Sequence, residues 1–332
     1  MKWKFYSLAF VAGMSILTAC SSDDNNDNDG NGGNGNGNEI ENGTILKGTI
    51  TSDVTLAAGN TYKLSGEYIV EEGATLHIEE GVKIIAVYDD IADYILVKQG
   101  GKINAVGTPD KPIVMTSEKE EPGAWGGIHI CGRAHTNAEG GKGSSEIGGA
   151  VYGGNDDADN SGTLQYIRLE YTGFAFDEEH EANGISFYGV GNGTIVDHCQ
   201  AYKGSDDGFE FFGGSVNVSN LVAVSCSDDS FDWTEGWNGK GTNLVAYQEA
   251  ESTLGYDCDC LMECDNNGSN NAATPVAHPV LKNLILVGNG GSKQGIRLRA
   301  GTEVEIDNAK VCGKGQPLTV ETALTENALK NG

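Results

Sequence analysis

The stretch that decides the fold runs from Ser205 to Trp237 and contains one short motif twice. Ser-Asp-Asp-Gly-Phe-Glu-Phe-Phe occupies 205–212, and Ser-Asp-Asp-Ser-Phe-Asp-Trp-Thr occupies 227–234, 22 residues later. A repeat of roughly 20–30 residues that alternates apolar and polar positions, with glycine at its corners, is typical of a stacked solenoid. We therefore predict that each repeat forms one coil, whose short strands pair with the coils above and below.

Stacking places equivalent residues of adjacent coils about 4.8 Å apart, which is the spacing between paired strands. Because side chains alternate across a strand, Phe209 and Phe211 would point into the core while Glu210 points outward. In the next coil Asp232 would take the place of Glu210. The sequence therefore predicts a column of acidic side chains on the outside of one face.

Further segments at 184–188, 255–259 and 295–299 fit the same pattern. The predicted outward column consists of Ser186, Glu210, Asp232, Asp257 and Arg297. The column beside it consists of Tyr188, Phe212, Thr234, Asp259 and Arg299. A face that mixes aromatic, acidic and basic side chains is more typical of a binding site than of a general surface.

The acidic column would lie next to the doublets Asp206-Asp207 and Asp228-Asp229. Carboxylates this close repel one another and need a cation, a cationic ligand, raised pKa values or full solvation. We predict a divalent cation, calcium, with the ligands Asp206, Asp207, Asp228, Asp229 and Asp232. The alternative stays open that the doublets only form turns, which Asp-Gly sequences favour.

A second set of segments, 166–169, 198–201, 220–223, 243–246 and 283–286, shares another pattern. Its apolar column steps by 32, 22, 23 and 40 residues, which predicts two bare coils and two coils with inserted loops. Asn220, Asn243 and Asn283 would stack at a corner, with their amides hydrogen-bonded along the solenoid axis. His198 lies in this column, and we interpret it as a structural corner residue rather than a catalytic one.

The composition fits an all-β solenoid with many turns, since 49 of the 332 residues are glycine. The chain carries 21 Lys and Arg against 48 Asp and Glu, a formal net charge of −27. A charge this negative argues against nucleic acid as a partner, because phosphates need a basic surface. It also argues against adhesion to anionic lipid headgroups, and it is compatible with metal ions or with an exported protein.

Residues 1–19 have a basic start and an apolar run, which is typical of a secretory signal peptide. Leu17-Thr18-Ala19-Cys20 resembles the bacterial lipoprotein box. The resemblance implies that Cys20 becomes the lipidated first residue and anchors the protein to a membrane.

Residues 20–44 are predicted to be a disordered tether, because this range is rich in Asn, Gly and Asp and has little to bury. The acidic tract that follows Cys20 is similar to the surface-export signal of lipoproteins in Bacteroidetes. This similarity implies an outer-membrane location facing the cell exterior.

From Ile45 onward the chain alternates like short strands, at 75–78, 82–85, 94–97, 102–105 and 113–116. Two segments resemble sequences of the parallel β-helix lipoproteins common in Bacteroidetes. They are Glu-Glu-Gly-Ala-Thr-Leu-His-Ile at 71–78 and Gly-Ala-Trp-Gly-Gly-Ile-His-Ile at 123–130. The resemblance covers about 45–312. It implies an all-β fold, a single-stranded right-handed parallel β-helix over 45–332, but no particular activity, because that family is largely uncharacterised.

Three functions can be set against these residues. In the first, tandem Asp-Asp motifs resemble the calcium ladder of one pectate lyase family, which implies a calcium-dependent polysaccharide lyase with Lys240 or Arg297 as the base. In the second, paired carboxylates serve an inverting glycoside hydrolase, although the sequence lacks the Asn-Thr-Asp and Gly-His-Gly motifs of polygalacturonases. The residues leave open whether the protein is an enzyme.

The third function, which we favour, is that of a surface lipoprotein that binds a glycan or another cell-surface partner. Tyr188, Phe212 and Trp237 would stack on sugar rings while acids and arginines bind hydroxyl groups. The predicted ligand-binding residues are Tyr188, Glu210, Phe212, Asp232, Trp237, Asp257, Arg297 and Arg299.

Seven cysteines follow Cys20, namely Cys131, Cys199, Cys226, Cys258, Cys260, Cys264 and Cys312. Their spacing lacks the Cys-x-x-Cys pairs of a structural zinc site. Disulfides are plausible in an exported protein, but the sequence does not determine their pairing.

Overall fold

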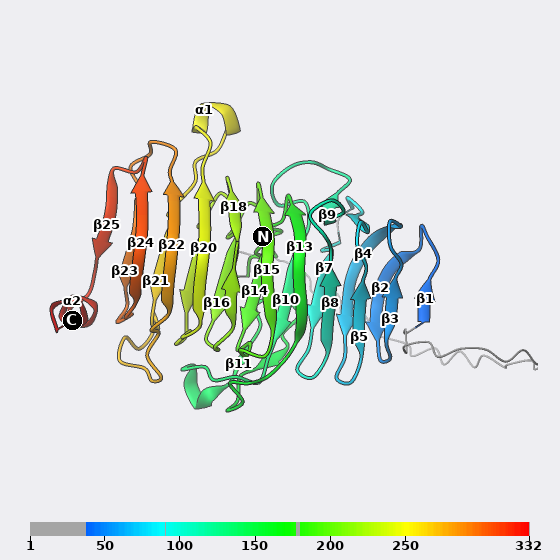
Figure 1. Ribbon diagram of the computed structural model, residues 1–332, viewed down its shortest axis with the longest axis horizontal. Helices are drawn as coiled ribbons and strands as arrows, with labels where there is room; N and C mark the ends of the chain where they lie inside the picture. The colour runs from blue at the N-terminus through cyan, green and yellow to red at the C-terminus, as the bar shows by residue number, and fades with distance from the viewer. Residues whose placement is uncertain (1–37, 90, 177–179, 332) are drawn as a thin grey trace, which may run out of the picture. The chain divides into compact units, whose positions relative to one another are not determined.

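The computed structural model describes residues 38–89, 91–176 and 180–331. These residues form a parallel β-helix, in which the coils follow one another in chain order from β1 to β25 (Figure 1). The predicted signal peptide, the lipidation site Cys20 and most of the predicted tether lie outside the described residues. Strand β1 falls within the range assigned to the tether, so the β-helix includes Asn38.

Short strands make up most of the regular structure. In chain order the strands are β1 (Asn38–Ile40), β2 (Ile45–Ile50), β3 (Val54–Leu56), β4 (Thr61–Val70), β5 (Thr75–Ile78), β6 (Lys83–Ala86), β7 (Tyr94–Val97), β8 (Lys102–Val106), β9 (Ile113–Ser117), β10 (Ile128–Cys131), β11 (Gly143–Ser144), β12 (Val151–Tyr152), β13 (Gly162–Glu170), β14 (Ile185–Tyr188), β15 (Ile195–Tyr202), β16 (Phe209–Phe212), β17 (Asn217–Ser219), β18 (Val222–Val224), β19 (Phe231–Thr234), β20 (Lys240–Tyr247), β21 (Met262–Asp265), β22 (Val280–Val287), β23 (Gln294–Arg299), β24 (Glu305–Cys312) and β25 (Gln316–Val320). The α-helices are α1 (Glu251–Leu254) and α2 (Ala323–Asn331).

Each coil contributes to three faces. Face 1 contains β7, β10, β14, β16, β19, β21, β23 and β25. Face 2 contains β17 and the first halves of β13, β15, β20, β22 and β24, while Face 3 contains β18 and the second halves of the same strands. The strand pairs of the three faces are parallel, whereas β11 and β12 form a separate antiparallel pair.

The prediction that the repeated motif places aromatic residues inward is confirmed. Phe209 and Phe231 pair in register and are buried, with their rings stacked at 5.6 Å between centroids. Phe187 stacks on Phe211 at 5.0 Å, and Phe211 stacks on Trp237 at 4.1 Å. These flat contacts along the solenoid axis stabilise the central coils through buried aromatic area.

The corner between Face 2 and Face 3 is the predicted asparagine column. Asn220, Asn243 and Asn283 have φ values of 54°, 57° and 59°, in the left-handed region that asparagine tolerates better than most residues. Their amides donate along the axis, from Asn243 to Asn220 at 2.8 Å and from Asn283 to Asn243 at 3.0 Å. The column continues with Asn308, and the half-exposed ring of His198 stacks on Tyr166 at its other end.

Replacing Asn243 by alanine is expected to lower the free energy of unfolding by about 1–3 kcal/mol, because it removes two amide hydrogen bonds and strains a residue at positive φ. Asn243→Gly separates the two effects, since glycine adopts this φ freely but makes no side-chain hydrogen bond. Urea titration should rank the proteins parent, Gly variant, Ala variant in decreasing stability. Equal stability of all three would contradict a structural role for the column.

The segment between β10 and β13, which contains β11 and β12, packs on the outside of Face 1. Its residues Ile147, Ala150 and Tyr152 form a second hydrophobic cluster with outward side chains of Face 1, including Tyr188 and Phe212. Tyr152 lies 5.2 Å from Tyr188 between ring centroids. The segment therefore covers outward side chains of Face 1 as far along the axis as Phe212 of β16.

None of the helices in the described ranges has the length and apolar character that crossing a membrane requires. The seven cysteines after Cys20 are present as free thiols, and all except Cys312 are buried.

Candidate functional site

In the central coils of Face 1, the outward side chains of β14, β16 and β19 line up in the predicted register. Ser186 pairs with Glu210, and Glu210 pairs with Asp232, so the two acids lie side by side on the same face. The next two members are Glu263 and Arg297, because β21 pairs with β19 and β23 pairs with β21. The column is therefore mainly acidic over three successive coils.

The prediction of Asp257 as a member of this column is wrong. Asp257 lies in the loop between α1 and β21, where its Oδ1 accepts hydrogen bonds from Cys258 N at 2.9 Å and from Asn289 Nδ2 at 2.8 Å. Glu263 takes the predicted place of Asp257, and Asp265 takes that of Asp259 in the neighbouring column. The physical reason is the inserted loop with α1, which lengthens this coil beyond the 22-residue step.

Sequence reasoning also missed Glu146, Asn183, Glu263 and Asp265. The alternation Met262-Glu263-Cys264-Asp265 was a signal for the last two, since apolar residues flank one outward acid in the same way as around Glu210. Glu146 belongs to the covering segment, where no repeat shows its position.

The second aspartate of each doublet is held by the coils on either side. Asp207 Oδ1 accepts a hydrogen bond from Asp229 N at 2.8 Å, and Asp229 Oδ1 accepts one from Cys260 N at 2.6 Å. Asn183 begins this row, because its Oδ1 accepts from Asp207 N and its Nδ2 donates to Glu210 Oε2 at 2.6 Å. One carboxylate oxygen of each of these aspartates thus shapes the turn, as the turn-forming alternative expected, and the other is left for further contacts.

Within the described ranges, four groups of side chains bring their ligand atoms within 4.8 Å of one another. The groups are Asp206 with Asp207 and Asp228, Asp207 with Glu210 and Asp232, Asp229 with Asp232 and Glu263, and Asp229 with Asp259 and Cys260. Adjacent groups share Asp207, Asp232 or Asp229, so they form one continuous series across the coils. We call the carboxylates of this series the acidic row.

Burial and mutual repulsion shift the acidic row toward its protonated form. Asp207 is only 5% exposed and Asp229 only 4%. Burial, followed by repulsion from neighbouring carboxylates, raises the pKa of Asp207, Glu210, Asp229 and Asp232 well above the ordinary range. The same causes raise the pKa of Asp206 to about 8.

The residues fit a hard divalent cation. Asp232 Oδ1 is buried without a hydrogen-bond partner, although it lies beside four other acids of the row. Three of the four groups offer only carboxylate oxygens, which are the ligands that calcium prefers. A bound cation would supply the positive charge that allows these acids to ionise together. All five predicted metal ligands belong to these three all-carboxylate groups, which also contain Glu210 and Glu263.

Ion pairs close the row at its C-terminal end. Arg297 contacts Glu263 at 2.9 Å and Glu321 at 3.1 Å, and Arg299 contacts Asp265 at 2.8 Å and also Glu263. Carboxylates on both sides raise the pKa of Arg297, so it stays charged. A guanidinium held charged in this way is poorly suited to act as a base, and both arginines are already engaged in binding acids.

Lys240, the other predicted base, is on a different face. It opens β20 on Face 2, where it pairs with Val280 and its backbone N–H donates to Asn217 Oδ1. The acidic row belongs to the turns and outer surface of Face 1. The prediction that Lys240 acts beside the row is wrong, because the sequence does not show on which face a residue between two repeats lies.

The aromatic residues expected to stack on sugar rings are not available for that contact. Trp237 is 1% exposed and lies in the core, where its Nε1 donates to the Val216 carbonyl. Tyr188 and Phe212 are outward but stack on each other at 4.4 Å under the covering segment. Tyr188 also donates to Glu146 Oε2 at 3.3 Å.

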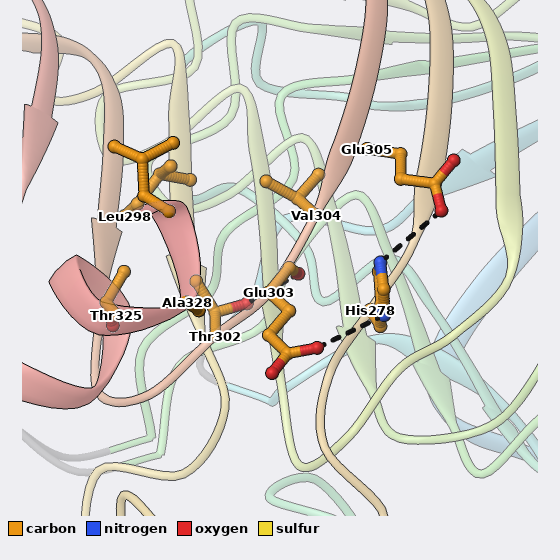
Figure 2. A pocket seen from close by; sticks show the side chains of 9 residues that line it. His278, Leu298, Thr302, Glu303, Val304, Glu305, Thr325 and Ala328 are labelled. Carbon is orange, nitrogen blue, oxygen red and sulfur yellow. Dashed lines mark hydrogen bonds and ion pairs between the residues drawn. The ribbon is translucent and has the colours of Figure 1, made fainter. Parts of the chain in front are cut away.

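A cavity of about 450 Å³ lies elsewhere, at the C-terminal end of the β-helix beneath α2 (Figure 2). Figure 2 shows His278 between Glu303 and Glu305, which it contacts at 3.3 and 3.6 Å. The two acids meet opposite nitrogens of the imidazole ring, so these three side chains do not converge on one point. The cavity shares no residue with the acidic row.

A family model described as a pectate-lyase-like β-helix domain matches residues 48–332. No curated protein matches the chain. The match covers all three faces and the acidic row.

Proposed function

Because the chain belongs to the pectate-lyase-like β-helix family, we propose that it binds carbohydrate with the help of divalent cations held by the acidic row. The family is consistent with a carbohydrate-related function. The single observation that supports a cation site is the series of shared carboxylates. At its centre, Asp232 Oδ1 is buried and has no hydrogen-bond partner.

Calcium takes six to eight oxygen ligands, and a group of three carboxylates leaves some of these positions for other oxygens. Sugar hydroxyls or uronate carboxylates have the chemistry to fill them. A cation also removes the repulsion that a chain with a net charge of −27 would exert on an acidic polysaccharide. We therefore propose an acidic glycan as the ligand of this face.

The lyase alternative has less support. The basic side chains nearest the row, Lys293, Arg297 and Arg299, are each paired with carboxylates. Among the residues that the structure describes, none of the predicted bases stands free beside the acids. An inverting hydrolase needs its two carboxylates about 6.5–9.5 Å apart, whereas the ligand atoms within each group lie within 4.8 Å of one another.

Asp232→Asn is expected to weaken calcium binding by at least about tenfold, because it removes a charge shared by two groups and costs on the order of 1.4 kcal/mol or more. Isothermal titration calorimetry of the chelator-treated protein measures this. Asp110→Asn is the matched control, since Asp110 is exposed in the turn after β8. Absence of calcium binding by the parent protein would reject the cation.

Affinity electrophoresis in polygalacturonate and alginate gels, with calcium or with EDTA, then tests the carbohydrate. Retardation that needs calcium and is lost in Asp232→Asn supports the proposal. Calcium binding without retardation by any uronate polymer would reject the proposed glycan ligand but support the proposed cation site. Release of unsaturated products, followed by ultraviolet absorbance, would identify a lyase instead of a binding protein.

We further propose that lipid on Cys20 anchors the protein in the outer membrane, with the β-helix facing the cell exterior. The motif at 17–20 supports this location. Cys20→Ala is expected to abolish labelling by a fatty-acid analogue and to move the protein from the membrane fraction to the soluble one. Unchanged labelling would contradict the anchor, and resistance of the intact-cell protein to added protease would contradict surface exposure.

A further inference from the structure

The cavity beneath α2 is lined on one side by apolar side chains. Leu298, Val304 and Ala328 line it directly, and we call these three residues the apolar wall. Leu298 belongs to the hydrophobic core of the β-helix, and Val304 packs against that core. The apolar wall is therefore held in place by the last coils and does not depend on a ligand for its position.

Two threonines that also line the cavity add little polarity to it. Thr302 is 1% exposed, and its Oγ1 accepts a hydrogen bond from Trp233 Nε1 at 3.0 Å. Thr325 is 2% exposed, and its Oγ1 accepts a hydrogen bond from Gly301 N at 2.9 Å. Because both hydroxyl groups already have partners within the protein, this part of the cavity suits a hydrocarbon group.

Two carboxylates give the cavity a negative side. Glu303 and Glu305 line it together with His278, which lies between them (Figure 2). An imidazole carries at most one positive charge, so two ionised carboxylates leave this group with a net negative charge. Figure 2 shows these three side chains on one side of the cavity and Leu298 and Ala328 on the other. A ligand inside would thus meet negative charge at one end and apolar surface at the other.

Helix α2 covers the cavity with few buried side chains of its own. In the described part of this helix Thr325 is the buried residue, whereas Leu324 is 46% exposed and Leu329 is 63% exposed. A helix of nine residues depends on packing, because isolated helices this short are marginal in water. The cavity of about 450 Å³ lies within the range of small-molecule sites. A ligand that fills it would supply packing to α2.

We propose that this cavity binds a primary alkylammonium ion, with its hydrocarbon chain on the apolar wall and its ammonium group beside Glu303 and Glu305. The apolar wall favours the chain, because burying methylene groups is favourable. The two carboxylates favour a positive head group over a neutral or negative one. The ligand is opposite in charge to the acidic glycan proposed for the acidic row, and its site needs no cation.

Isothermal titration calorimetry of the full chain, with EDTA present, tests the site with butylammonium, hexylammonium, 1-hexanol and hexanoate. Hexylammonium is expected to bind with a dissociation constant of about 1 mM or below. Butylammonium should bind about tenfold more weakly, because it buries two fewer methylene groups. Hexanol should bind at least about threefold more weakly than hexylammonium, and hexanoate should not bind, because neither carries a positive charge.

Substitutions separate the apolar wall from the carboxylates. Ala328→Phe fills the cavity and should abolish binding, whereas Asn327→Phe is the matched control, because Asn327 is exposed on the same helix. Glu303→Gln combined with Glu305→Gln should weaken hexylammonium binding about tenfold and leave hexanol binding unchanged. Glu326→Gln is the control for charge, since Glu326 is an exposed acid of α2 that pairs with Lys330.

Hydrogen exchange of α2 gives a second readout, which saturating hexylammonium should slow several-fold. Thermal unfolding of each variant at the parent's midpoint excludes loss of folding as the cause. Asp232→Asn should leave hexylammonium binding unchanged, so failure of this site is distinct from failure of the cation site. No saturable binding of hexylammonium up to about 10 mM, equal binding of hexanoate, or undiminished binding by folded Ala328→Phe would each overturn the proposal.

Discussion

Raising the pH from about 4 to about 8 is expected to lower the free energy of unfolding of the metal-free protein. Burial first, and repulsion by Asp228 next, raise the pKa of Asp206 from its ordinary value of 3.8 to about 8. Burial raises the pKa of Glu146 from 4.5 to about 7. In this window the folded protein binds more protons than the unfolded chain, so each rise in pH favours unfolding.

Calcium is expected to reverse this loss, because a bound cation stabilises the ionised form of acids whose pKa values burial raises in the metal-free fold. A ligand present at a hundred times its dissociation constant adds about 2.7 kcal/mol to the free energy of unfolding. Protons compete for the same oxygens, so calcium should raise the melting temperature strongly at pH 8 and little at pH 5. Thermal melts at several pH values, with calcium or with EDTA, measure both effects.

Asp93 supplies the control for this experiment. Its carboxylate accepts a hydrogen bond from Gly66 N, and burial raises its pKa to about 7, away from the four carboxylate groups. Asp93→Asn should therefore reduce the pH dependence of stability while leaving the calcium response intact. Asp206→Asn should reduce both. A calcium response of equal size at pH 5 and pH 8 would show that the acidic row is not the binding site.

The stacking of the coils was predictable because the sequence carries its own register. Phe209 and Phe231 occupy equivalent places in motifs that match over eight residues, and a shift by one residue would turn both rings outward. The asparagine column gave an independent register, since Asn220 and Asn243 open segments that share one apolar pattern. The aromatic motif and the asparagine column lie at different places around the coil but give the same register. Together they allow only one way to stack the coils.

The prediction failed where a coil departs from its bare length. The loop that contains α1 separates Asp232 from its true neighbour Glu263, and Gly255-Tyr256-Asp257 in that loop imitates the repeated motif. A glycine followed by an aromatic residue and an acid is compatible with a turn as well as with a strand. Only pairing with β19 distinguishes the two, and pairing is a property of the tertiary structure.

Exposure on an outward face was the second property that the repeat does not encode. Tyr188 and Phe212 have the predicted orientation, but the segment between β10 and β13 covers them with Ile147 and Tyr152. That segment has no repeat, so its packing partner is not visible in the sequence. The burial of the acidic row was not visible in the sequence for a related reason. The turn of each coil is hydrogen-bonded to the turn of the next coil, as where Asp229 N donates to Asp207 Oδ1.

Trp237→Ala is expected to cost about 3–5 kcal/mol of unfolding free energy, since the indole is stacked on Phe211 and packed near Trp233 in the core. Trp237→Phe should cost less, because it keeps an aromatic ring on Phe211 and loses mainly volume and the hydrogen bond to Val216. Urea unfolding followed by circular dichroism measures both losses. The folded Phe variant also decides between the two roles considered for this residue. A core residue changes stability and leaves the affinity for glycans unchanged, whereas a sugar-stacking residue would weaken glycan binding at unchanged stability.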